Sequence, residues 1–215
     1  LTTSVGNDVS GIASGDVTAS AAADLVITSA SDDELRIISE SQTTPGTLKR
    51  GGPYATRAGP RGPSIGDAWD GAVEGNEIVI ANSGETTGTL SVFDGLGVAL
   101  ASYDATAGAG AQAWDTLVTD ILHGVGGAET AVSFRNTEGA GGINVYPRLV
   151  GGGLGTRTTY TTGSRFASSR LASGDIDSDG HPELLVGNDG VVASTLTLSA
   201  APSVQSFSAD GSGIS

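Results

Sequence analysis

The sequence predicts an all-β protein built from four similar units, and three observations support this prediction. Leading aspartates recur at positions 16, 67, 120 and 175, with separations of 51, 53 and 55 residues. The 34 glycines among 215 residues favour closely spaced turns over helices. Helical periodicity is weak along the whole chain. We therefore predict a single domain over residues 1–215, with repeats at about 10–60, 61–110, 111–163 and 164–215.

The first and last repeats share a strand-loop-strand frame. Ala13–Asp16 corresponds to Ala172–Asp175, and Asp24–Val26 corresponds to Glu183–Leu185. In both repeats the two acids lie eight residues apart. This correspondence predicts that a loop joins the first two strands of each unit.

The second and third repeats keep this frame with longer loops. One runs from Ile65–Asp67 to Glu77–Ala81, and the other from Val118–Asp120 to Glu129–Phe134. Their loops are two and one residues longer than that of the fourth repeat, and they lack its acidic triplet. We expect these loops to keep the shape without a cation site.

Further strands are expected after this frame, giving four strands in each repeat. Ala111–Leu122 has a helical alternative, but we interpret it as an inner strand with a preceding loop. The other predicted strands are Thr89–Phe93, Val98–Tyr103, Ile143–Tyr146, Thr156–Tyr160, Thr195–Leu198 and Val204–Phe207.

Repeats of this length, each a four-stranded antiparallel unit, are typical of β-propeller blades. A single blade cannot bury both of its faces, so neighbouring blades must stack. The expected architecture is a β-propeller-like array of four antiparallel four-stranded blades. The array is either four-bladed and closed or part of a larger propeller or assembly.

The loop of the fourth repeat concentrates acidic residues around one point. Acids at its positions one, three, five and nine, with a glycine at six, can turn several oxygens toward one hard cation, as Ca²⁺ prefers. Without a cation these carboxylates would repel one another. The predicted Ca²⁺ ligands are Asp175, Asp177, Asp179 and Glu183 through their side chains and His181 through its carbonyl.

The loop has two other interpretations. An EF-hand needs a glutamate at position twelve and a following helix, whereas position twelve is Val186 in a β-prone run. An acidic surface turn without metal is the other alternative. In the first repeat, the corresponding positions Asp16, Thr18, Ser20 and Asp24 form a possible degenerate site. Neutral hydroxyls bind Ca²⁺ weakly, so hydrogen bonds are expected to hold that loop.

The Gly-Asp lead-in, the acidic loop and the exit Glu183–Gly187 resemble the FG-GAP/VCBS family. This family is known from the integrin α-subunit head and from secreted bacterial and archaeal proteins. The resemblance is closest over residues 166–190, weaker over 12–30 and 64–83, and weakest over 114–136. It implies a propeller with structural Ca²⁺ between the first two strands of a blade, usually with seven or eight blades. It also implies an extracellular or cell-surface location.

Composition restricts the partners. The 24 acidic and 10 basic residues give a formal charge of −14, which argues against nucleic acid and anionic membrane surfaces. No apolar stretch approaches the roughly 18 residues that span a membrane, so no membrane insertion is expected. The absence of cysteine excludes disulfides and thiolate sites.

One stretch breaks this pattern. Residues 45–66 hold four of the seven prolines and four of the ten basic residues, with no acid. It could dock an acidic surface, but we favour a long inter-blade connection with solvated charges.

Asp210–Ser215 is similar to Asp8–Ala13, as if a further repeat began there. If so, copies could join head to tail.

No catalytic constellation is recognised, and we expect no enzyme. The two histidines, His123 and His181, lack triad partners at a suggestive spacing. Trp69 and Trp114 could stack on sugar rings, although core packing is the commoner role of tryptophan.

Three functions remain open. The favoured one is an extracellular, Ca²⁺-stabilised structural or adhesive module whose partners are other proteins or copies of itself. The alternative is a carbohydrate-binding propeller, either a lectin or the non-catalytic part of a polysaccharide-degrading enzyme. The third is a catalyst that uses acidic residues at the central face of the propeller.

Overall fold

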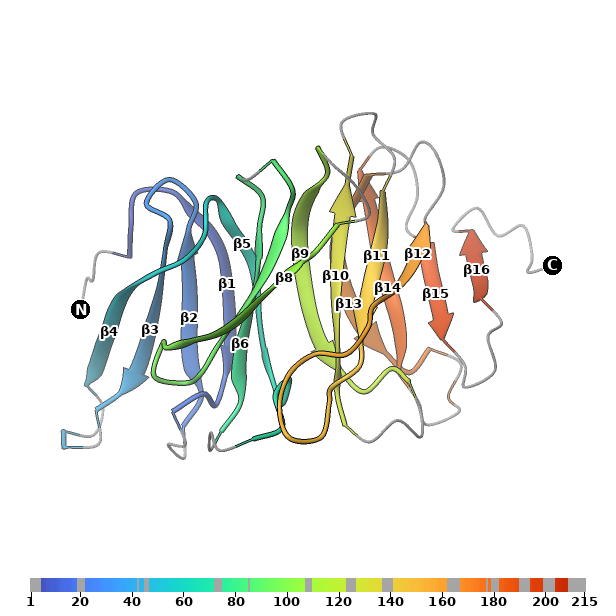
Figure 1. The fold of residues 1–215 in the computed structure, drawn as a ribbon. Helices are drawn as coiled ribbons and strands as arrows, with labels where there is room; N and C mark the ends of the chain where they lie inside the picture. The colour runs from blue at the N-terminus through green and yellow to red at the C-terminus, as the bar shows by residue number, and fades with distance from the viewer. Residues whose placement is uncertain are drawn as a thin grey trace.

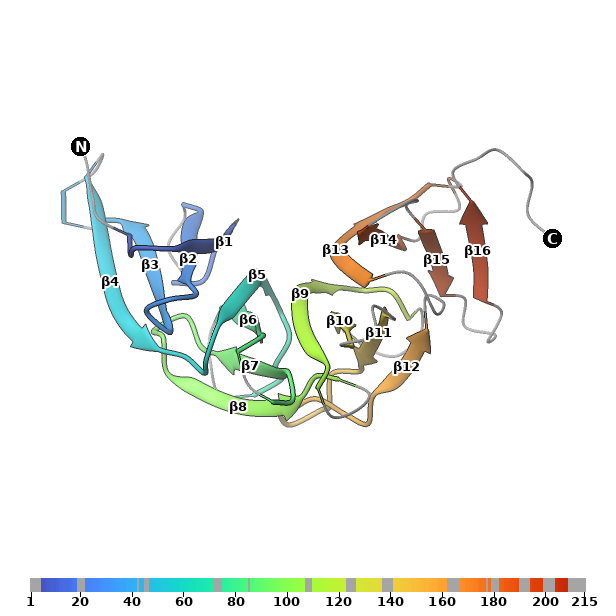
Figure 2. The ribbon, with the colours of Figure 1, turned by 90° about the horizontal axis from the view of Figure 1, so that it is seen from above.

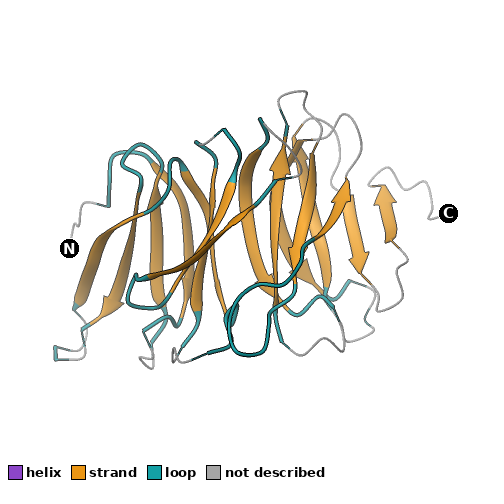
Figure 3. Cartoon of the chain, in the orientation of Figure 1, coloured by secondary structure: helices purple, strands orange, loops and turns teal. Residues whose placement is uncertain are grey.

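The computed structural model describes most of the chain. The described residues are 5–18, 22–41, 43–44, 47–71, 75–84, 86–106, 110–122, 127–136, 141–161, 167–176, 178, 182–189, 194–198 and 204–208. They form sixteen strands and no helix (Figure 3).

The strands form four antiparallel sheets, each made of four strands that are consecutive along the chain (Figure 1). The first sheet contains β1 (Val9–Gly15), β2 (Asp24–Ser29), β3 (Glu34–Glu40) and β4 (Leu48–Ala55). The second contains β5 (Pro60–Gly66), β6 (Glu77–Asn82), β7 (Thr89–Phe93) and β8 (Ala99–Asp104). The third contains β9 (Gln112–Thr119), β10 (Glu129–Arg135), β11 (Gly141–Tyr146) and β12 (Thr158–Thr161). The fourth contains β13 (Ala167–Gly174), β14 (Glu183–Asp189), β15 (Ser194–Leu198) and β16 (Val204–Ser208).

This arrangement confirms the predicted array of four antiparallel four-stranded units. The sheets follow one another around an open arc, seen from above in Figure 2. The first strand of each sheet, β1, β5, β9 or β13, lies on the inner side of the arc, and the fourth strand lies on the outer side. The second strands β6 and β10 are apolar runs buried on both faces because they have a neighbouring sheet on each side.

Three hydrophobic cores join neighbouring sheets. Each is formed by apolar side chains that alternate between the two faces of a strand, so one strand serves two cores. In β6, Ile78 and Ile80 pack toward the first sheet, whereas Val79 and Ala81 pack toward the third. The third core contains Leu184 and Val186 of β14. Stacking of sheets, and not any single sheet, therefore buries the apolar surface.

The expectation for residues 45–66 was wrong. Within this segment, Leu48–Ala55 forms β4 on the outer side of the first sheet, and Pro60–Gly66 forms β5 on the inner side of the second. Only residues 56–59 connect the two sheets. Glycines suit β5 and its neighbours because inner strands approach closely, and a side chain at Gly11 would overlap the ring of Pro63.

Candidate functional site

The loop between the first and second strands occurs in all four sheets with the same register. In each case the acid that ends the loop pairs, across the two strands, with the residue just before the leading aspartate. The pairs are Gly15 with Asp24, Gly66 with Glu77, Thr119 with Glu129, and Gly174 with Glu183. The four loops are therefore structurally equivalent despite their different lengths.

In the first three loops, the terminal acid closes the loop by accepting hydrogen bonds from backbone N–H groups at loop positions two and three. Asp24 Oδ2 accepts from Val17 and Thr18 at 2.9 and 3.0 Å. Glu77 Oε2 accepts from Ala68 and Trp69, both at 2.9 Å. Glu129 Oε2 accepts from Ile121 and Leu122 at 2.8 and 2.9 Å. A carboxylate that accepts two N–H groups satisfies donors that would otherwise be buried without a partner.

The first loop is held by hydrogen bonds, as expected. The Thr18 hydroxyl also donates to Asp24 Oδ2, at 3.0 Å. Asp16 is exposed and Asp24 is fully buried, so these two acids lie in different surroundings. Ser20, the remaining residue of this possible degenerate site, lies outside the described residues.

The second carboxylate oxygen of the closing acid in each of the first three loops is buried and, within the described part of the chain, has no hydrogen-bond partner. These atoms are Asp24 Oδ1, Glu77 Oε1 and Glu129 Oε1. Burial raises the pKa of Glu77 to about 6, against the two backbone N–H donors, and the nearby Asp67 raises it further. Burial likewise raises the pKa of Glu129, again with a contribution from its own leading acid, Asp120.

An arginine supplies positive charge at the second loop. The guanidinium of Arg148 forms an ion pair with the leading acid Asp67. Arg148 also lies against Gly127 of the third loop, where a side chain would overlap its guanidinium. The side chain of Arg148 is 18% exposed and that of Asp67 is 56% exposed, so the pair is partly solvated. Arg148 thus neutralises the leading acid of the second loop, which occupies the position of Asp175 in the fourth.

The fourth loop keeps the same closure. Glu183 is buried and its Oε2 accepts a hydrogen bond from Ile176 N at 2.6 Å. Asp175 is exposed, and Ser178 has a left-handed φ of 63°, which turns the backbone within the loop. Asp177, Asp179 and His181 lie outside the described residues. The residues that are described contain no group of three potential metal ligands.

The donor set of the fourth loop fits a hard cation. Its frame closes through Glu183, which accepts the N–H group at loop position two as the other closing acids do. The leading acid Asp175 has a counterpart in every loop, so Asp177 and Asp179 are the additions that loop closure does not require. Carboxylate oxygens are the ligands that Ca²⁺ prefers. Asp175, Asp177, Asp179 and Glu183, with the carbonyl of His181, are the residues that would hold it.

Both tryptophans contact other parts of the chain. Trp69 is half-buried against the core between the second and third sheets, and its indole lies beside Gly152. Trp114 lies beneath two guanidinium groups, with Arg61 at 4.6 Å and Arg135 at 3.4 Å from the ring centroid. His123 lies outside the described residues.

The role of Glu77 and Glu129 as loop-closing acids was not foreseen from the sequence. The signal was present, since both residues occupy the position of Glu183 in the repeat alignment. Their backbone partners, however, become visible only when the loop conformation is known.

Four four-stranded antiparallel sheets stacked around an arc, each with an acid-closed loop after its first strand, define a propeller-type repeat protein. Residues 167–197 match the model of the FG-GAP repeat family. The fourth repeat is therefore an FG-GAP repeat, which confirms the resemblance expected from the sequence. No curated protein matches the chain. The part of the chain that is described has no helix of the length and hydrophobicity needed to cross a membrane.

Proposed function

We propose that this protein is an extracellular structural or adhesive module that is stabilised by Ca²⁺ in its fourth repeat and associates head to tail with copies of itself. The observation that carries the proposal is the exposure of Ile176, the second residue of the fourth loop. Ile176 is 53% exposed, whereas the equivalent Val17, Ala68 and Ile121 are at most 1% exposed. Val17 of the first repeat packs against the second sheet, Ala68 of the second repeat against the third, and Ile121 of the third repeat against the fourth.

The first sheet has the complementary feature. Leu25 of β2 is 37% exposed, whereas the equivalent Ile78 and Leu184 in the second and fourth sheets are fully buried. Those two residues face the preceding sheet. The fourth sheet thus offers the surface that a following sheet would cover, and the first sheet offers the surface that a preceding sheet would cover.

A second copy supplies the sheet that each end needs. The first sheet of one copy would pack on the fourth sheet of another as sheets already pack three times within the chain. Such a contact joins two different surfaces, so it is heterologous and either closes into a ring or continues as a filament. Full burial of one aliphatic side chain contributes about 1.5–3 kcal/mol, so Ile176 and Leu25 would both favour this contact.

Calcium fits this proposal because the fourth loop borders the exposed face. A cation among its aspartates would hold the loop without a covering sheet. A net charge of −14 and a requirement for Ca²⁺ both suit an extracellular setting, where the cation is abundant.

The test is the mass of the particle in Ca²⁺ by light scattering after size-exclusion chromatography, supported by electron microscopy. We expect assemblies for the wild type, and a loss of assembly for both Ile176→Gln and Leu25→Arg. Mixing the two variants should restore dimers, because one intact contact remains between them. The control Val150→Gln alters an apolar side chain that is 95% exposed elsewhere and should assemble normally.

A monomeric wild type at high protein concentration in Ca²⁺ would refute self-association. If Val150→Gln abolished assembly as fully as Ile176→Gln, the contact would not involve the end sheets.

A further inference from the structure

A cavity of about 370 Å³ lies where the inner strands of all four sheets meet. Its walls are residues 11–13 of β1, 62–65 of β5, 115–117 of β9 and 170–171 of β13. This volume lies at the lower end of the range of small-molecule sites, roughly 300–1,000 Å³. None of the four loops lines the cavity, and neither do Leu25 and Ile176, the exposed residues of the first and fourth repeats.

Every inner strand contains a register shift beside this cavity. The shifts occur before Gly11 in β1, before Ser64 in β5, before Asp115 in β9 and before Arg170 in β13. All four of these residues line the cavity. Bulges redirect the side chains that follow them and are frequent beside functional sites. The same irregularity therefore orients one residue from each sheet toward a common space.

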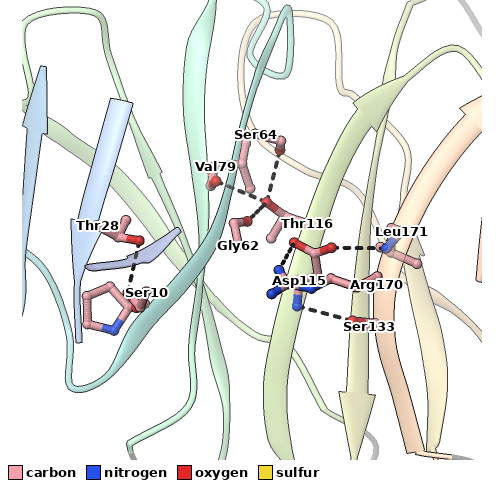
Figure 4. A network of polar contacts seen from close by, with 11 residues as sticks. Ser10, Thr28, Gly62, Ser64, Val79, Asp115, Thr116, Ser133, Arg170 and Leu171 are labelled. Atoms are coloured by element: carbon pink, nitrogen blue, oxygen red, sulfur yellow. Dashed lines mark hydrogen bonds and ion pairs between the residues drawn. The ribbon is translucent and has the colours of Figure 1, made fainter. Parts of the chain in front are cut away.

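Asp115 and Arg170 bring opposite charges into this space (Figure 4). Asp115 Oδ2 accepts a hydrogen bond from Leu171 N at 3.0 Å, whereas its Oδ1 lies 4.0 Å from Arg170 Nη1. That separation is too long for a hydrogen bond, so both groups keep capacity for a further partner. The Asp115 side chain is 11% exposed and that of Arg170 is 66% exposed. Burial raises the pKa of Asp115, against the Leu171 N–H, the Arg170 charge and the Thr116 N–H, which also donates to this carboxylate.

The neighbouring polar groups are already engaged. The hydroxyls of Ser64 and Thr116 are hydrogen-bonded to each other at 2.9 Å, and Thr116 also reaches the carbonyls of Gly62 and Val79 (Figure 4). Gly62 has a left-handed φ of 47°, and a side chain there would overlap the carboxylate of Asp115. The position of this carboxylate thus depends on a glycine in the adjacent sheet.

The charges of the cavity select the class of ligand. An anion would meet the Asp115 carboxylate and a chain with a charge of −14, and a cation would meet Arg170. A neutral molecule with several hydroxyl groups can donate to Asp115 and accept from Arg170 at once. Aliphatic walls from Pro63, Ile65 and Leu117 suit the C–H faces of such a molecule.

We infer that this cavity is a binding site for a neutral polyhydroxylated small molecule of monosaccharide size, with Asp115 and Arg170 as its polar contacts. This assignment does not depend on Ca²⁺ binding or on self-association. It also differs from stacking on Trp69 or Trp114, because neither tryptophan lines the cavity.

The test is a titration followed by amide chemical shifts, with glucose, galactose, mannose, xylose and N-acetylglucosamine as neutral probes and glucuronate and glucosamine as charged ones. The protein is kept dilute and in chelator, so that assembly and metal play no part. At least one neutral sugar should shift the amides of residues 11–13, 62–65, 115–117 and 170–171. The charged sugars should bind about tenfold more weakly, since each loses one favourable polar contact or gains repulsion.

Variants distinguish this site from general surface binding. Arg170→Gln keeps an exposed side chain and should retain the fold, yet it should weaken binding by about tenfold. Gly62→Ala should displace the Asp115 carboxylate and weaken binding similarly. Arg50→Gln, on the exposed β4, is the matched control and should bind as the wild type does. The inference is overturned if no neutral sugar shifts these amides, if shifts centre on Trp69 or Trp114, or if Arg170→Gln binds normally.

Discussion

The first three loops and the fourth loop close in the same way but in different surroundings. In each, a terminal acid accepts the N–H group of the residue at loop position two. In the first three, the second loop residue is buried beneath the next sheet, whereas Ile176 of the fourth is exposed. The fourth loop is also the one with acids at positions one, three and five. Packing holds the first three loops, and this difference indicates that the fourth needs another source of stability.

The largest expected effect is the difference in unfolding free energy lost when a buried or an exposed isoleucine is replaced by alanine. Ile121→Ala should lower the free energy of unfolding by about 3 kcal/mol, because it opens a cavity in the core between the third and fourth sheets. Ile176→Ala should change it by less than about 0.5 kcal/mol in dilute, unassembled protein. Urea denaturation of the two variants measures both values. Equal losses would mean that the fourth loop is packed like the third.

A smaller effect is expected from removing a closing acid. Glu77→Ala leaves the N–H groups of Ala68 and Trp69 without their acceptor and should cost about 2 kcal/mol of unfolding free energy. Asp8→Ala, at an exposed acid outside the loops, is the control and should cost less than about 0.5 kcal/mol. If the two variants unfolded at the same urea concentration, loop closure by Glu77 would contribute nothing to stability.

A pH dependence of a size similar to the effect of Glu77→Ala is also expected. The pKa of Glu77 is raised in the folded protein to about 6, from a reference value of 4.5, so the folded state binds the proton more tightly than the unfolded state. Stability should therefore fall as pH rises through this window, by about 2 kcal/mol in total, and be recovered below it. Glu77→Gln removes the titrating group and should flatten this part of the profile. A wild-type profile parallel to that of Glu77→Gln between pH 4.5 and 6 would contradict the assigned shift.

Much of the fold follows from local sequence patterns. Apolar runs such as Glu77–Ala81 and Glu129–Phe134 predict buried strands, and the recurring leading aspartates predict four units. The two strands within residues 48–66 were not predicted, because glycine and proline are usually rare in strands. Here glycine allows the backbone to pack closely against its neighbours.

The acidic loop can be predicted from the sequence, but the cavity with Asp115 and Arg170 cannot. The acidic triplet stands out because its spacing is local, whereas Asp115 and Arg170 lie 55 residues apart in the sequence. They meet only because two inner strands stack with matching register shifts. Such contacts depend on tertiary packing that no short sequence window contains.

The central claim is that a cation stabilises the fourth loop where packing stabilises the others, and thermal unfolding with added Ca²⁺ or with chelator tests it most directly. Asp175→Asn and Asp16→Asn form a matched pair, since both replace the exposed leading acid of a loop. Ca²⁺ should raise the melting temperature of the wild type and of Asp16→Asn, because a ligand that binds only the folded state stabilises that state. The melting temperature of Asp175→Asn should be the same with and without Ca²⁺, because this variant lacks one of the ligands. A wild-type melting curve that is the same in Ca²⁺ and in chelator, or an Asp175→Asn variant that responds like the wild type, would contradict the account.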